Sequence, residues 1–525
     1  MKAIYQHPQE EAQLAFLLKN DLFRTLTTTY EQLYASVTGF SEVRNRNFRV
    51  TKQSHPRLNE LFQYAIRRLR CKGSVAFFLE FDNAYSCRLL GSDGDAALLL
   101  SSKCLEDMDD SELLALIGRQ LAHIQCQHVA YLGINSMIEP LLQRIPLAGA
   151  AASEVVKGLL FSWRQYAEMT ADRGGALVSG SPNYLAKALM HQMGGCIDRD
   201  SARFWAGIRG FRMDQPVEGK ITDAILQRIV QELPVPFGMQ RLSELMRWCG
   251  SDWCRQNLPH LYYNCSCNTG FREGEDAGVL LQRALSCGGR EERLLLLHSA
   301  ARGGNSQAKA YLGRAYLGGS DGVPKDPELG INYIMQGARA CDADALYTLG
   351  KLYRAGVPGR LAKNTQLSDW LVRAAYGQGQ AAAVRELRDK PIRVPCISGA
   401  LMEKLCKNHA APPPQVRAAL LRWLWIPPQD TIAAWEIAAN DERYPKAIAV
   451  CDTGIYLRDI NTVPHWIDWQ SFFQGAFTVK MLSGSVALLF NGKELWRGAQ
   501  NSASALVHDL IRLAKSKKRK EETSL

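Results

Sequence analysis

The chain has 525 residues, of which 46% are hydrophobic and 22% are charged, and its formal net charge is +11 at pH 7. This composition is that of a globular protein and argues against wholesale disorder. The length predicts about three or four domains, since domains usually contain about 100–200 residues. The positive charge is small for this length, so no nucleic-acid partner is expected.

Residues 1–73 are predicted to be helical, because apolar residues recur at three- and four-residue spacing in the segments "EEAQLAFLLKNDLFRTLTTTYEQLYASV" and "HPRLNELFQYAIRRLR". The first 18 residues contain acidic residues and Pro8 but no long apolar core, so they do not read as a signal peptide. We therefore expect a cytoplasmic protein whose 14 cysteines are free thiols.

A small sheet is predicted after Gly73, because the runs "SVAFFLEF" and "DAALLLSS" are typical of strands and are separated by the turn-rich segment "GSDGD". We interpret the second run as an edge strand. Its residues Leu98, Leu99 and Leu100 are predicted to bind an extended peptide by strand addition.

The segment "DDSELLALIGRQLAHIQCQHV" predicts a strong helix, whose start Asp109 and Glu112 can cap reciprocally. Zinc peptidases of the HExxH type carry two histidines four residues apart on such a helix, with a glutamate beside the first as the base for metal-bound water. Here Arg119 and Gln120 stand where the first histidine and the glutamate are expected, and His123 stands at the second histidine.

Helices are predicted to continue to about residue 248, and the segment "WRQYAEMTADRGGALV" offers Glu168 as a further ligand. His128 follows His123 by five residues, which is about 140° round a helix, so we expect it to face elsewhere. A replacement ligand from a distant segment, such as His191 or Asp172, stays open, although a satisfied polar role is the favoured interpretation for both.

Several motifs in the first 250 residues resemble the HtpX and CAAX-prenyl-protease type of zinc metallopeptidase, metallopeptidase family forty-eight. These are the helix around Arg119, "NAY" before a hairpin, "EMTADR", "LMHQMGG" and "QRLSELMRW". The resemblance covers roughly residues 4–250. It implies a zincin-like peptidase domain at residues 74–250, with residues 1–73 as its N-terminal helical part.

The resemblance implies that His123 and Glu168 occupy metal-ligand positions, that Arg119 replaces the first ligand and that Gln120 replaces the general base. Arginine offers no lone pair to a metal, and glutamine is too weak a base. We therefore expect a pseudopeptidase without a cofactor, in which Arg119 pairs with Glu168 in place of the metal. The alternative is an active zinc metalloendopeptidase with an atypical ligand set.

The most apolar window, residues 138–163, contains charges and two prolines, so it predicts two buried or amphipathic helices rather than a membrane span. A peripheral membrane contact stays open. Residues 251–279 are predicted to be a linker. The nearby group of Cys249, Cys254, Cys265, Cys267 and His260 lacks paired CxxC spacings, so unligated cysteines are favoured over a structural zinc site.

Residues 280–390 contain an internal repeat with a step of 37 residues, which aligns Ala308 with Ala345 and Gly313 with Gly350. Small residues let paired helices approach closely, and stacked pairs bury a continuous core. The pattern A-x-x-x-L-G-x-x-Y-x-x-G resembles Sel-one-like repeats, relatives of the tetratricopeptide repeat. This resemblance implies an α-solenoid that contacts a protein partner.

Residues 395–525 are predicted to form a small β-rich domain closed by a helix, loosely similar to bacterial pleckstrin-homology-type modules. The basic tail "KSKKRKEE" is interpreted as a solvated end of the chain, with a binding patch for nucleic acid or anionic lipid as the alternative. The whole chain is thus expected to be mainly α (α+β). The predicted function is a peptide- or protein-binding scaffold that acts through its cleft and its helical repeats.

Overall fold

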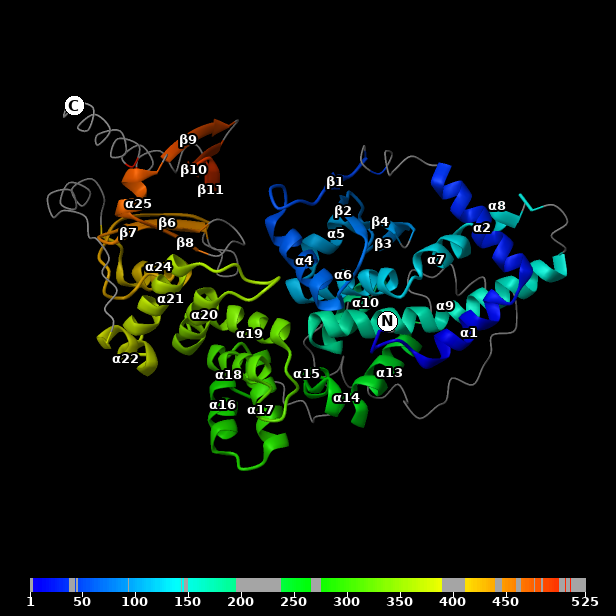
Figure 1. Cartoon of the computed structure of the whole chain (residues 1–525), viewed down its shortest axis with the longest axis horizontal. Helices are drawn as coiled ribbons and strands as arrows, with labels where there is room; N and C mark the ends of the chain where they lie inside the picture. Colours follow the sequence, from blue (N-terminus) through cyan, green and yellow to red (C-terminus); the bar gives the residue numbers. More distant parts are fainter. Residues whose placement is uncertain are drawn as a thin grey trace. The chain divides into compact units, whose positions relative to one another are not determined.

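A computed structural model describes residues 3–36, 43, 46–92, 94–142, 144–145, 150–194, 238–265, 275–389, 411–439, 446–458, 464–475, 477–482, 485–499, 506 and 510. The chain is mainly helical with small sheets, as predicted (Figure 1). It divides into two compact units, Met1–Asp276 and Ala277–Leu525.

The sheet of the first unit has four strands in the order β1-β2-β4-β3, namely β1 (Phe48–Arg49), β2 (Ser74–Glu80), β4 (Asp95–Ser101) and β3 (Cys87–Gly91). β2 and β4 are parallel, and the outer pairs are antiparallel. The prediction that Leu98, Leu99 and Leu100 form an edge strand is therefore wrong. These leucines are buried in the central strand, where an unbroken apolar run covers both faces, and β3 is the edge.

Helices make up most of the rest of this unit (Figure 1). In the described residues up to 249 they are α1 (Pro8–Leu18), α2 (Asp21–Ser36), α4 (Pro56–Leu69), α5 (Ser102–Asp107), α6 (Asp110–Gln125), α7 (Val129–Ser136), α8 (Ile138–Leu142), α9 (Ala150–Ser179), α10 (Pro182–Gln192) and α13 (Gly238–Cys249). The predicted capping box at the start of α6 is confirmed, because Asp109 accepts from the Glu112 backbone and the Glu112 side chain accepts from the Asp109 backbone.

Helices α6 and α9 approach each other closely because glycines lie at their contact. A Cβ added at Gly118 would lie 2.6 Å from the Cβ of Val178, and one added at Gly175 would lie 2.7 Å from the Ala115 carbonyl oxygen. Such distances are far below van der Waals contact. The close approach brings the polar face of α6 directly against α9.

The apolar window 138–163 forms α8 and the first half of α9. Leu141, Leu160 and Trp163 are fully buried in a core with residues of α1, α2 and α7. Among the described residues, no helix is both long and apolar enough to cross a membrane.

The linker prediction for residues 251–279 is wrong for its first half. Helices α14 (Asp252–Asn257) and α15 (Pro259–Tyr263) lie there, and Cys254, Leu258 and Leu261 are buried in the first unit's main core. The apolar residues that build this packing are spaced among cysteines, a proline and polar residues, so the segment shows no clear helical period. Cys249, Cys254 and Cys265 are buried cysteines, and Cys267 lies outside the described residues.

The second unit begins with stacked helices over the predicted repeats. They are α16 (Ala277–Ser286), α17 (Arg290–Arg302), α18 (Ser306–Gly318), α19 (Pro327–Arg339), α20 (Ala343–Ala355), α21 (Thr365–Gly377) and α22 (Ala381–Asp389). The aligned residues Ala308 and Ala345 are fully buried. A Cβ at Gly313 would lie 2.7 Å from Ile334, which shows why a small residue is needed there.

The C-terminal part is β-rich, as predicted. After α24 (Pro414–Leu424) come two antiparallel sheets, β5-β6-β7-β8 and β11-β10-β9, formed by β5 (Ile432–Ala439), β6 (Lys446–Cys451), β7 (Gly454–Arg458), β8 (His465–Asp468), β9 (Phe477–Leu482), β10 (Ser485–Phe490) and β11 (Lys493–Ala499), with α25 (Trp469–Gln474) between β8 and β9. The predicted closing helix is described only at Leu506 and Leu510, which are helical and buried, and the basic tail lies outside the description.

The C-terminal part is not separate from the repeats. Trp370 of α21 packs in one buried cluster with Trp425 and Tyr456, and its indole nitrogen donates to the Trp425 carbonyl at 2.9 Å. A buried ion pair between Arg373 of α21 and Asp430 adds a polar link. The repeats and the first C-terminal sheet therefore share a core.

Candidate functional site

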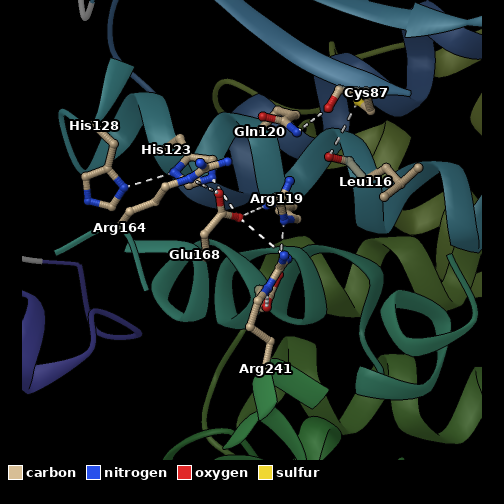
Figure 2. A network of polar contacts seen from close by, with 10 residues as sticks. Cys87, Leu116, Arg119, Gln120, His123, His128, Arg164, Glu168 and Arg241 are labelled. Carbon is tan, nitrogen blue, oxygen red and sulfur yellow. Dashed lines mark hydrogen bonds and ion pairs between the residues drawn. The ribbon is translucent and has the colours of Figure 1, made fainter. Parts of the chain in front are cut away.

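Helices α6 and α9 bring the predicted site residues Arg119, His123 and Glu168 together (Figure 2), and Asp172 lies beside them. Arg119 and His123 lie one turn apart on α6, while Glu168 and Asp172 lie one turn apart on the facing part of α9. Their exposed fractions are 8%, 1%, 4% and 0%, so the cluster is shielded from water.

The Arg119 guanidinium joins the two carboxylates of α9. Its Nη2 forms an ion pair with Oε2 of Glu168, and its Nε donates to Oδ1 of Asp172 at 3.0 Å. The predicted pairing of Arg119 with Glu168 is thus present. Asp172, considered above as a distant metal ligand, is instead an acceptor for arginine.

A second arginine, which sequence reasoning missed, completes this network. Arg241 of α13 donates to Asp172 from Nε at 2.8 Å and from Nη2 at 2.7 Å, and its Nη1 lies 3.5 Å from Oε2 of Glu168. Arg164 of α9 lies on the other side, with its Nε 3.6 Å from Oε1 of Glu168. Three guanidinium groups therefore surround the Glu168 carboxylate (Figure 2).

One ring nitrogen of His123 faces this network, and its other ring nitrogen faces His128. Its Nε2 lies 4.0 Å from Oε2 of Glu168, and its Nδ1 lies 3.0 Å from Nδ1 of His128. The expectation that His128 faces elsewhere is wrong, because α6 ends at Gln125 and Gln127 has a left-handed φ of 60°. The rotation of 100° per residue does not continue through that turn.

Glu10, a further residue that sequence reasoning missed, lies beyond the two histidines. Its Oε1 is 2.9 Å from Nε2 of His128, and its other oxygen accepts from the Thr170 hydroxyl. Burial raises the pKa of Glu10, but the hydrogen bond and charge of His128 and the donors Thr170 and Gln6 outweigh burial and leave the pKa below its ordinary value. No helical spacing links a residue this far away to His128.

The Gln120 side chain points away from the arginines. Its Nε2 donates to the backbone carbonyl oxygen of Cys87 in β3 at 2.5 Å (Figure 2). Gln120 stands at the position expected for a general base, but its amide is buried and already donates a hydrogen bond to the edge strand β3.

Burial shapes the charges of the cluster. Burial and the neighbouring Arg241 lower the pKa of Arg119 to about 10, which leaves the guanidinium charged near neutral pH. Burial and the charge of Arg119 hold the pKa of His123 well below its ordinary value, so its imidazole is neutral. The cluster is thus a set of cationic guanidiniums around two carboxylates.

The side chains of this cluster do not fit a zinc ion. Zinc takes thiolate, imidazole and carboxylate donors, whereas the group paired with Glu168 is a guanidinium that cannot donate a lone pair. Within the described ranges, no group of three or more histidine, cysteine, aspartate and glutamate side chains could hold a metal. His191 lies on α10 and its ring packs 4.9 Å from that of Tyr85.

Comparison with known proteins gives one informative similarity. Over 114 residues, the chain is 26% identical to the plastoglobule-localized metallopeptidase 48, chloroplastic, of Arabidopsis thaliana. The chain is metallopeptidase-like. The match covers 22% of this chain and spans about a third (33%) of the length of that protein. No family model and no solved structure matches the chain.

Proposed function

We propose that this metallopeptidase-like chain does not hydrolyse peptides and instead serves as a protein-binding scaffold. The observation that carries the proposal is the Arg119 guanidinium, which is paired with Glu168 and hydrogen-bonded to Asp172. A cation of the protein itself thus neutralises the carboxylate that the family resemblance assigns to the metal.

Hydrolysis by this class of enzyme needs a metal-bound water and a base beside it. Arg119 stays protonated and offers no lone pair, so the first ligand is lost. Gln120 is not a useful base, and its amide is engaged by Cys87. Two separate requirements of the reaction are therefore missing from the cluster.

The guanidiniums also explain how the fold tolerates the loss of a metal. Glu168 and Asp172 without a cation would be buried carboxylates, which are costly in a low-dielectric interior. Arg119 and Arg241 supply charge-assisted hydrogen bonds to them. In this proposal, the arginines take over the structural role of the metal without its chemistry.

The helices of the second unit support the scaffold role. We assign them as Sel-one-like repeats, whose stacked helices present a continuous surface to a protein partner. The two C-terminal sheets followed by helical residues support a pleckstrin-homology-type module.

An active zinc endopeptidase is the second candidate function. It is favoured by the similarity to a metallopeptidase and by the proximity of His123 to Glu168, whose nearest ring nitrogen and carboxylate oxygen are 4.0 Å apart. In that case Arg119 would have to leave Glu168, and a further ligand would have to approach.

Metal analysis separates the two candidates. Protein purified without chelator is expected to contain far less than one zinc per chain and to leave casein intact. Near-stoichiometric zinc that depends on Glu168 would overturn the proposal.

Two double variants test whether the cleft is otherwise preserved. Arg119→His with Gln120→Glu restores both missing groups, and we expect it to bind zinc and to cleave casein. Arg119→His with Gln120→Ala is the matched control, which restores the ligand but not the base. It is expected to bind zinc without cleaving casein.

A further inference from the structure

Two loops occupy equivalent places in the helical repeats of the second unit. The first loop, residues 319–326, joins α18 to α19, and the second loop, residues 356–364, joins α20 to α21. Gly319 and Gly356 begin these loops with the same φ of 74°, and each turn then contains another left-handed glycine, Gly322 at 81° and Gly359 at 71°. Both pairs of glycines are separated by the repeat step, so the two loops can be compared directly.

The first loop is covered by a side chain of the chain itself. A Cβ added at Gly322 would overlap the guanidinium of Arg290, the first residue of α17. The loop contains one lysine and two aspartates, so its formal charge is −1. The cation of Arg290 therefore covers a loop of opposite charge.

The second loop has no such cover within the described residues. One repeat step of 37 residues after Arg290, the first residue of α19 is Pro327, which is short and uncharged. Nothing lies within 4 Å of a Cβ added at Gly359. A cavity of about 550 Å³ is present at this loop, lined by residues 355–363. This volume is within the range of roughly 300–1,000 Å³ that is usual for ligand pockets.

The lining of the cavity combines apolar side chains with cations. Its charged residues are Arg360 and Lys363, so the second loop has a formal charge of +2. Glu328 of α19 pairs with Arg360 at 3.2 Å, whereas the exposed Lys363 has no ion-pair partner among the described residues. The apolar residues of the lining are Ala355, Val357, Pro358, Leu361 and Ala362. An apolar side chain next to a carboxylate would complement both features.

We propose that the second loop binds an acidic segment of a partner polypeptide, which inserts an apolar side chain into the cavity and places a carboxylate beside Lys363. This inference rests on the proposed scaffold function, and it names the chemistry of the partner that the repeats take. The comparison of the loops supports the sign of the charge. The anionic first loop is covered by a cation of the chain, and the uncovered cationic loop is complementary to an anion.

A fluorescein-labelled random copolymer of glutamate and tyrosine is a suitable probe, because it is acidic and carries large side chains. Its binding to the full chain can be followed by anisotropy. Two further copolymers separate the requirements, since polyglutamate lacks the aromatic side chains and a copolymer of lysine and tyrosine has the opposite charge. The copolymer of glutamate and tyrosine is expected to bind most tightly, and equal or tighter binding of either other polymer would contradict the proposal.

Lys363→Glu tests the charge at the second loop. Its matched control is Lys325→Glu, because both lysines are exposed and their backbone nitrogens lie 3.3 Å from a Cβ added at the equivalent glycines, Gly356 and Gly319. The two substitutions change the net charge equally. Lys363→Glu is expected to weaken binding of the glutamate–tyrosine copolymer by about threefold to tenfold, and Lys325→Glu by much less. Equal losses would show unspecific attraction and overturn the proposal.

Pro358→Asp tests the cavity. It makes an exposed part of the lining acidic and less apolar, whereas the matched control Pro324→Asp changes an exposed proline of the first loop. Pro358→Asp is expected to weaken binding of the glutamate–tyrosine copolymer more than Pro324→Asp does. Equal binding by the two variants would mean that the cavity does not take the probe.

Amide hydrogen exchange in the unmodified protein gives a readout that needs no variant. A saturating amount of the glutamate–tyrosine copolymer is expected to slow exchange in residues 356–363 and to leave residues 319–326 unchanged, and equal responses contradict the assignment. Zinc content and casein cleavage are independent of this measurement. A zinc-free, inactive protein with equal responses at the two loops would retain the proposed inactivity and lose this binding site.

Discussion

Arg241 of α13 holds the Asp172 carboxylate of α9 with two hydrogen bonds, of 2.8 and 2.7 Å, and both side chains are only 1% exposed. Truncation of one partner of a buried ion pair leaves the other charge without compensation. We therefore expect Arg241→Ala to lower the free energy of unfolding by about 3–5 kcal/mol in urea titrations.

Arg247 lies on the same helix and provides the control. It pairs with Glu244 at 3.1 Å, but its side chain is 48% exposed. Exposed ion pairs contribute roughly 0–1 kcal/mol, so Arg247→Ala should change stability by no more than about 1 kcal/mol. Similar small losses for both variants would show that the buried network does not support the fold.

Arg119→Ala probes the proposed substitution of a guanidinium for the metal. It leaves Glu168 without its closest cation and removes the 3.0 Å hydrogen bond to Asp172, so a loss of roughly 3 kcal/mol is expected in metal-free buffer. Arg119→Lys keeps the positive charge but lacks the planar guanidinium fork. Its stability should therefore lie between those of the unmodified protein and Arg119→Ala. An unchanged melting temperature for Arg119→Ala would contradict the substitution.

The contact between Arg119 and Glu168 could be predicted because the resemblance to a zinc-peptidase family assigned both positions to one metal site. Helical spacing alone places only Arg119 and His123 on one face of α6. Arg241 and Glu10 could not be found in this way. They reach the site from α13 and α1, and only tertiary packing brings those segments to Asp172 and His128.

Two wrong predictions show where local rules stop. The angle assigned to His128 assumed a continuous helix, whereas Gln127 takes a left-handed conformation and turns the chain. The run that contains Leu99 was interpreted as an edge strand, but the parallel pairing of β2 with β4 places it in the centre of the sheet. Neither the left-handed turn at Gln127 nor the parallel pairing of β2 with β4 leaves a periodic signal in the sequence.

Glu436 of β5 provides a pH-dependent prediction outside the site. Its Oε1 is buried and has no hydrogen-bond partner among the residues that the structure describes, and burial raises the pKa of this carboxyl to about 7. A raised folded pKa means that stability is fully present below the unfolded value, near 4.5, and is lost as the pH rises through about 7.

Glu436→Gln removes this titration. Because the side chain is only half-buried, solvent screening reduces the effect, and we expect the variant to be about 1–2 kcal/mol more stable than the unmodified protein at pH 8. The two proteins should have equal stability near pH 4.5. Denaturant titrations at both pH values check this, and a difference that does not depend on pH would point to packing instead of ionisation.

The glycine contact between α6 and α9 leads to the last prediction. A methyl group at Gly118 would lie 2.6 Å from the Cβ of Val178, so Gly118→Ala must push the helices apart or shift their side chains. Such overpacking costs roughly 1–3 kcal/mol, which outweighs the better helix propensity of alanine.

Gly158→Ala in α9 is the matched control, because nothing lies within 4 Å of its added Cβ. That variant should be stabilised by about 0.5–1 kcal/mol, provided that helix propensity alone acts. Val178→Ala should offset only part of the loss in Gly118→Ala, since it removes the clashing Cγ1 and Cγ2 atoms but keeps the Cβ. Additive effects of the two substitutions would mean that the helices do not meet at this pair, and that Arg119 reaches Glu168 for another reason.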